Sequence, residues 1–383
     1  MTYNKLLKYW LYSLAAVLYI SFFFFSYRPI DYENLIVPLL SIDSIQDYFL
    51  AHKNGFIYDL QPIRDISHLI DIRLYYLLPF KWGYLQNLII LFISLFFIKR
   101  LLKNKLDNKT LLLVLAIISI HPTIHSVILE STSRKHLLAF MFIILYQISH
   151  LKGAHKKSLA FYTLSLLSNP LYILVPLYNG LDKSKKIIYI TKYSILAIFL
   201  AANYYYYSVI YPTLSSVNKI GGFFSFTEHI KILGLYFKQF IFPINNVHFY
   251  NVPSLALSIT LILLFTALYW FSVTKEKVKA KKLLLIVFPY AILYSNSNDI
   301  IYQNQYAILF TVVNVYIYSK VFKKQLILII TFLFFLICTF KNVYFILHNS
   351  KNDLIAKYFQ EYNYKEIRAR RCIHCTRPDS YTI

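Results

Sequence analysis

The chain is poor in cysteine and in charged residues. Its 383 residues include only three Cys, and 15% of them are charged while 58% are hydrophobic. Cys338 lies within an apolar run. Cys372 and Cys375 form a lone CxxC pair without the second ligand pair of a structural zinc site, and a disulfide or two free thiols suit that pair equally well. The sequence therefore predicts no metal site and no resident cofactor.

The motifs of nucleotide-driven and soluble hydrolytic chemistry are also missing. The chain has no Walker loop, GxGxxG, GxSxG or HExxH sequence, which argues against ATP-driven transport and against a soluble hydrolase. No Ala-rich cleavage site follows the first apolar run, so we expect a retained helix rather than a signal peptide. Without an internal repeat or a Gly/Ser-rich linker, no separate soluble domain is expected.

Long apolar runs are what the chain has instead. A soluble domain of this length could not bury so much apolar surface, so the composition predicts an integral membrane protein. The expected fold is all-α, a polytopic membrane helix bundle of about 11 transmembrane helices that occupies residues 1–347. The apolar runs fall near residues 9–27, 84–98, 110–121, 136–150, 158–168, 170–180, 187–209, 254–273, 283–295, 305–319 and 325–347.

The basic residues indicate the orientation of this bundle. The formal net charge is +23, but Lys and Arg cluster in every second connection between apolar runs, a pattern that sets membrane topology rather than one that binds nucleic acid. By the positive-inside rule these connections and the N-terminus are cytoplasmic. The clusters are Lys5 and Lys8; Lys99, Arg100, Lys103 and Lys105; Lys152, Lys156 and Lys157; Lys183, Lys185 and Lys186; Lys275, Lys277, Lys279, Lys281 and Lys282; and Lys320, Lys323 and Lys324.

The opposite, extracytoplasmic face receives the long connections. The first, residues 28–83, is too long for a simple connector and reads as short interfacial helices such as Ile42–Ala51 and Ile66–Leu78. A second large loop covers residues 210–253, and a short basic tail covers residues 348–383. Because the polar loops gather on this face, we expect the chemistry there, in a multi-pass protein of the bacterial inner membrane.

A polar segment between two apolar runs, His121 to Leu138 (HPTIHSVILESTSRKHLL), is the strongest candidate for a site. Ionisable groups at membrane depth are costly, so a functional role is the default interpretation. Arg134, Lys135 and His136 begin a helix whose N-terminus favours an anion, and Arg grips phosphate bidentately. The alternative is an anchor that reaches lipid head groups.

Two further acidic stretches lie in the first extracytoplasmic loop. Asp31, with Glu33 two residues later, suits a general base at the membrane surface, although a solvated loop acid or a helix cap is the simpler interpretation. Asp65, His68 and Asp71 are spaced three residues apart and share one face of a helix. They suit metal or proton handling, but the solvated face of an amphipathic helix is the favoured interpretation.

Six stretches, in order over residues 25–310, resemble the membrane-embedded GT-C glycosyltransferases, specifically the transmembrane-and-tetratricopeptide proteins and their bacterial relatives. Asp31 and Pro38 stand where that family has an acid and an Asn-Pro, and LQPIRDISHLIDIRLYYLLPFKWGYLQNLIIL is similar to its entry into the second span. His121, Pro122, Arg134, Leu137 and Leu138 are in register with its His-Pro segment. SNPLYILVPLYNGLD and GGFFSFTEHIKILGLYFKQFIFPINNVHFYNVP are similar to later segments, the second through Tyr236, Pro243 and Tyr250.

The resemblance implies inverting transfer of a sugar from a polyprenyl-phosphate donor in the bilayer to a protein or glycan acceptor outside the cytoplasm. It implies Asp31 as general base. It implies stabilisation of the leaving phosphate by Arg134, with Lys135 and Arg64 beside it. The supporting residues are His121, His125, Glu33, Glu130 and Tyr236.

The chain departs from the family pattern at several positions. Ile30 replaces the first acid, Ser126 replaces the Glu of the His-Pro segment, Gln305 replaces an Arg, and no tetratricopeptide array follows the last span. A cell-envelope polysaccharide polymerase or ligase is therefore an alternative function. A lipid-linked-sugar flippase and a non-catalytic relative are further alternatives. A flippase is a transporter, however, and a transporter is expected to have an inverted repeat and ionisable groups at mid-membrane.

Overall fold

The computed structural model describes six stretches of the chain, residues 42–53, 61–77, 82–129, 133–169, 308–321 and 325–350, and the single residues Ser13, Ala16, Tyr19, Leu39, Tyr172, Val175, Pro176, Ile195 and Ile198. The regular structure of these residues is helical, without a strand. The principal helices are α3 (Ile45–Lys53), α4 (Pro62–Leu77), α5 (Trp82–Leu102), α6 (Asn108–Ile120), α7 (Pro122–Leu129), α8 (Arg134–Leu151), α9 (His155–Ser168), α17 (Ile308–Val321) and α18 (Gln325–Ser350).

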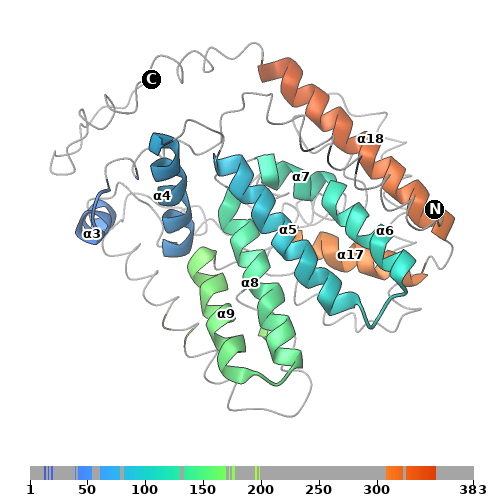
Figure 1. Ribbon diagram of the computed structural model, residues 1–383, viewed down its shortest axis with the longest axis horizontal. Coiled ribbons are helices and arrows are strands. Elements are labelled where there is room, and N and C mark those ends of the chain that lie inside the picture. The colour runs from blue at the N-terminus through green and yellow to red at the C-terminus, as the bar shows by residue number, and fades with distance from the viewer. Residues whose placement is uncertain are drawn as a thin grey trace, which may run out of the picture.

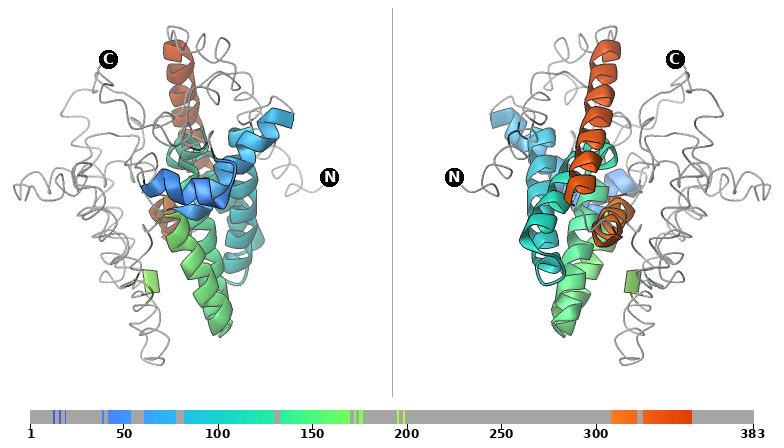
Figure 2. Two further views of the ribbon diagram at one scale, coloured as in Figure 1. Left: turned by 90° about the vertical axis from the view of Figure 1, so that its left-hand side faces the viewer. Right: turned by 90° about the vertical axis from the view of Figure 1, so that its right-hand side faces the viewer.

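Helices α5 and α8 form the centre of the described bundle and run in the same direction (Figures 1 and 2). Each is followed by a helix that returns: α6 after α5, and α9 after α8. The two connecting turns lie at the same end of the bundle, and both are basic (Figure 1). Helix α4 packs beside the other end of α5, α8 and α9. The described helices therefore separate a basic end from an end that contains α4, α7 and the starts of α5 and α8.

Local sequence signals explain where these helices turn. Asp107 caps α6 because its carboxylate accepts the backbone N–H groups of Lys109 and Thr110, each at 3.0 Å. Helix α8 ends in a Schellman motif: the N–H of Ala154 donates to the carbonyl of Ser149 at 2.9 Å, and Gly153 has the positive φ of 71° that this motif needs. Both caps fix the positions of the basic turns.

A proline separates α6 from α7. Pro122 is the first residue of α7, where its missing N–H removes no helical hydrogen bond. The preceding residue, His121, has extended-type ψ (131°) and ends α6. Long-range bonds hold this break in place: the hydroxyl of Thr339 on α18 donates to the carbonyl of Ile120 at 2.6 Å, and the hydroxyl of Tyr19 donates to the carbonyl of Ser119.

Helix α5 carries a stripe of exposed apolar side chains. Among the described helices, it is the one long and apolar enough to cross a membrane. Its polar residues Asn87 and Ser94 are buried, whereas large apolar side chains are exposed outward along it. Helix α18 exposes a similar stripe. The exposed residues are Ile89, Phe92, Ile93 and Phe96 on α5 and Leu326, Ile330, Leu333, Ile337 and Phe340 on α18. Contiguous apolar stripes of this kind favour a lipid environment.

Candidate functional site

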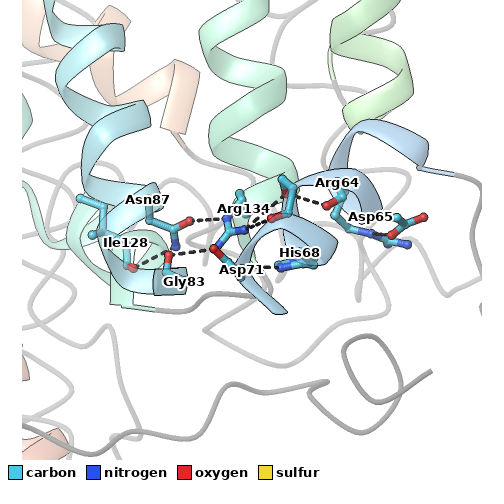
Figure 3. Close-up of polar contacts among 9 residues, drawn as sticks. Arg64, Asp65, His68, Asp71, Gly83, Asn87, Ile128 and Arg134 are labelled. Carbon is cyan, nitrogen blue, oxygen red and sulfur yellow. Dashed lines mark hydrogen bonds and ion pairs between the residues drawn. The ribbon is translucent and has the colours of Figure 1, made fainter. Parts of the chain in front are cut away.

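Arg134, the first residue of α8, is fully buried and lies at the junction of α4, α5 and α8 (Figure 3). Its Nε donates to Oδ1 of Asn87 on α5 at 2.9 Å. One terminal nitrogen donates to the carbonyl of Ser67 on α4 at 2.9 Å, and the other donates to the carbonyl of Gly83 at 2.9 Å and forms an ion pair with Asp71 on α4. Each guanidinium nitrogen therefore has an oxygen of this chain as its partner, and the side chain joins three helices.

Asn87 extends this junction toward α7. While its Oδ1 accepts from Arg134, its Nδ2 donates to the carbonyl of Ile128 at 3.0 Å (Figure 3). One amide in the second turn of an apolar helix thus connects the start of α8 to the last turn of α7. Two residues within the polar segment that the sequence singles out, Ile128 and Arg134, are thus anchored on α5.

Asp71 is mostly buried, with 15% of its side chain exposed. Burial raises the pKa of this carboxyl, and the charge and hydrogen bond of Arg134 oppose that rise. Only Oδ2 is engaged, with Arg134 and with the nearby ring of His68. Within the described part of the chain, Oδ1 is a buried oxygen without a hydrogen-bond partner.

His68 lies one helical turn before Asp71 and is 1% exposed. Its Nδ1 is 3.9 Å from Oδ2 of Asp71 (Figure 3). Burial holds the pKa of the imidazole well below its usual range, and the positive charges of Arg134, Arg64 and Lys135 lower it further. His68 is therefore neutral at pH 7, and its Nε2 has no hydrogen-bond partner in the residues that the structure describes.

A second buried ion pair lies at the start of α4. Nε of Arg64 donates to Oδ1 of Asp65 at 2.6 Å, and Nη1 of Arg64 donates to Oε1 of Gln61 at 3.3 Å. The hydroxyl of Tyr48 on α3 donates to the other oxygen of Asp65 at 2.7 Å, which ties α3 to α4. Arg64 and Asp65 thus form a fixed pair beside His68.

The polar face of α4 points into the protein rather than toward water, whereas the sequence suggests the opposite. Asp65, His68 and Asp71 do share one face, but that face is turned into the protein, so the interpretation of a solvated face is wrong. The outward side carries apolar residues instead, with Ile66, Ile70 and Leu77 all exposed. Arg134 explains the orientation, because its bonds to the Ser67 carbonyl and to Asp71 draw the polar face of α4 inward.

The two histidines of the His-Pro segment occupy the α6–α7 break. Nδ1 of His121 accepts from the backbone N–H of Thr123 at 3.2 Å, and its ring centroid lies 4.5 Å from that of Phe335 on α18. The ring of His125 stacks on that of Tyr19 at 6.0 Å. Both side chains are buried and hold the start of α7 against other helices.

Several predicted site residues lie outside the described residues: Asp31, Glu33, Glu130 and Tyr236. The structure does bring together Arg64, Arg134 and the neighbour of Arg134, Lys135, since all three act on the charge state of His68. In the stretches that are described, no group of three or more His, Cys, Asp or Glu is arranged to hold a metal ion.

The sequence analysis missed the pairing of Asp71 with Arg134. An Asn within an apolar run was the available signal, because a buried amide in a membrane helix needs a polar partner.

Comparison of the chain with protein-family models, with curated proteins and with solved structures finds no match.

Proposed function

We propose that this protein is a multi-pass membrane glycosyltransferase that transfers a sugar from a polyprenyl-phosphate donor to a protein or glycan acceptor on the extracytoplasmic face. The observation that carries the proposal is the buried Arg134–Asp71–His68 junction. It lies at the end of the bundle away from the two basic turns, and those turns are cytoplasmic by the positive-inside rule. Buried charge at one end of apolar helices is expected of a site that meets a charged lipid head group.

The charge balance of the junction favours an anionic ligand. Arg64, Arg134 and Lys135 carry three positive charges, and Asp65 and Asp71 carry two negative charges while His68 is neutral. Among the residues that the structure describes, the cations of this cluster therefore outnumber its carboxylates, in a buried environment where electrostatic attraction is weakly screened. A leaving phosphate gains negative charge as the glycosidic bond breaks, so an excess of positive charge stabilises the transition state.

Within this proposal, Arg134 and Lys135 have different roles. Arg134 already donates from each of its nitrogens to this chain, so it acts on the phosphate through its charge and by fixing α4 to α8. Lys135, the next residue of α8, is less deeply buried, and its ammonium group is the one that contacts the phosphate. Arg64 adds a third charge from α4.

The chemical step follows from the resemblance. Asp31 removes the proton of the acceptor hydroxyl as its oxygen attacks the anomeric carbon from the side opposite the phosphate. The bond between that carbon and the phosphate oxygen breaks, and the polyprenyl phosphate leaves with the electron pair. The configuration at the anomeric carbon is inverted.

Proteoliposomes with radiolabelled polyprenyl-phosphate sugars and membrane-extract acceptors test this function. We expect wild-type protein to transfer label and the Asp31→Asn variant to transfer none. Arg73→Gln serves as a control, since Arg73 lies on the exposed side of α4 and, within the described residues, bonds to the carbonyl of Ile42 and to the half-exposed carboxylate of Asp43. Transfer that survives Asp31→Asn removes Asp31 from the mechanism. Movement of the labelled lipid across the bilayer without its consumption identifies a flippase instead.

A further inference from the structure

Two atoms in the Arg134–Asp71–His68 junction are buried polar atoms without partners: Oδ1 of Asp71 and Nε2 of His68, as far as the described residues extend. Buried polar atoms in folded proteins are paired in the large majority of cases, and each exception calls for an explanation. These two exceptions stand on neighbouring turns of one helix, and the ring and carboxylate that bear them lie 3.9 Å apart at Nδ1 and Oδ2. The two side chains that bear these atoms are therefore neighbours, and hydroxyl groups of one small ligand suit them both.

The chemistry of the two atoms selects that ligand. Asp71 is paired with Arg134, so its Oδ1 is the oxygen of a carboxylate and only accepts hydrogen bonds. Nδ1 of the neutral His68 faces Oδ2 of Asp71, which favours the tautomer with the proton on Nδ1. Nε2 is then also an acceptor. Two acceptors on neighbouring side chains repel phosphate oxygens and suit O–H donors.

We propose that Asp71 Oδ1 and His68 Nε2 bind hydroxyl groups of a sugar ring, each accepting one O–H hydrogen bond. This inference rests on the proposed function and adds to it the residues that recognise the sugar, as distinct from those that neutralise the phosphate. Both the donor sugar and a glycan acceptor carry such hydroxyls. Arg134 orients Asp71 for this task, and burial, together with the cations around it, keeps the imidazole of His68 neutral and therefore able to accept.

Two substitutions of His68 separate this role from a structural one. The side-chain amide of Gln reaches the position of Nε2 and can still accept there, whereas the shorter amide of Asn occupies the position of Nδ1 and leaves the Nε2 position empty. Both keep a polar group in a buried place, so both avoid the larger damage of an apolar replacement. Arg73→Gln on the exposed side of α4 is the matched control.

The experiment measures binding of three probes to the full chain in detergent: undecaprenyl phosphate, undecaprenyl phosphate loaded with mannose or glucose, and the free methyl glycosides of these sugars. For recognition of the donor sugar, we expect one of the loaded lipids to bind wild-type protein about tenfold more tightly than the bare lipid, as two hydrogen bonds allow. His68→Asn abolishes this difference, while His68→Gln and Arg73→Gln keep most of it.

The other outcomes are equally decisive. If loaded and bare lipids bind alike but a methyl glycoside binds in a way that His68→Asn weakens, the hydroxyls belong to the acceptor. If no lipid binds while a glycoside still shows this dependence, the proposed donor is wrong and the sugar site stands. If His68→Asn changes neither lipid nor glycoside binding, or His68→Gln is as harmful as His68→Asn, the assignment of these two atoms to a sugar is overturned.

Discussion

Replacing Arg134 should destabilise the protein more than any substitution on its surface. Arg134→Met keeps the length of the side chain and removes its charge and its five N–H donors. Asn87 Oδ1 and the Ser67 carbonyl, both buried, each lose the hydrogen bond that Arg134 donates, and a hydrogen bond to a charged group contributes about 1.5–3 kcal/mol. Asp71 also loses its counter-ion, and breaking one side of a buried pair costs about 3–5 kcal/mol. Because these losses overlap, we expect a decrease of about 3–5 kcal/mol in the free energy of unfolding.

A double-mutant cycle tests the origin of that decrease. Asp71→Leu alone leaves the cation buried without its carboxylate, while Arg134→Met with Asp71→Leu leaves neither charge. We expect the double variant to lose less stability than the sum of the two single variants, by more than about 1 kcal/mol, because apolar groups replace a buried ion pair at little cost.

Unfolding of the detergent-solubilised chain by sodium dodecyl sulfate, followed by far-UV circular dichroism, measures all three variants. Arg73→Met is the control, since its ion pair with Asp43 is half exposed and contributes about 0–1 kcal/mol. A loss for Arg134→Met no larger than that for Arg73→Met would refute the description of Arg134 as the residue that joins α4, α5 and α8. Strict additivity in the cycle would refute the pairing with Asp71.

Two further predictions concern the neighbours of Arg134. His68 has a folded-state pKa well below that of the unfolded chain, about 6.5, so its contribution to stability is complete above that pH and decreases as the pH falls below it. Between pH 7 and 5.5 we expect wild-type protein to lose about 1 kcal/mol more stability than His68→Gln, and equal losses in the two proteins would contradict a neutral buried His68. Lys135→Gln should weaken binding of undecaprenyl phosphate about tenfold without a comparable loss of stability, because the role proposed for Lys135 is to contact the ligand, whereas Arg134 joins the helices. If the affinity for undecaprenyl phosphate is unchanged, Lys135 is instead an anchor that reaches lipid head groups.

The sequence predicted the helices of the described region well, because apolar runs and caps are local signals. The runs at 84–98, 110–121, 136–150 and 325–347 correspond to α5, α6, α8 and α18. The expected interfacial helices at 42–51 and 66–78 correspond to α3 and α4. The predicted runs 187–209, 254–273 and 283–295 lie almost wholly outside the described residues, and the bundle of about 11 spans stays a prediction.

The partners within the site were harder to predict. The three-residue spacing of Asp65, His68 and Asp71 places them on one face of α4, but it does not say whether that face meets water or protein. The answer depends on Arg134, 63 or more positions further along the chain, and on how α4 packs against α8. Periodicity reports which residues share a face, whereas long-range pairing decides what that face contacts.

The most direct test of the account is the sidedness of the two ends of the bundle. Single cysteines at Arg73 on α4 and at Lys103 in the basic turn after α5 are both on exposed positions. They are introduced after replacement of Cys338, Cys372 and Cys375. In intact bacterial cells we expect a membrane-impermeant maleimide to label Arg73→Cys and not Lys103→Cys, and in everted vesicles the reverse. Labelling of both positions from the same side, or of Arg73→Cys from the cytoplasm alone, would contradict a sugar-transfer site on the extracytoplasmic face.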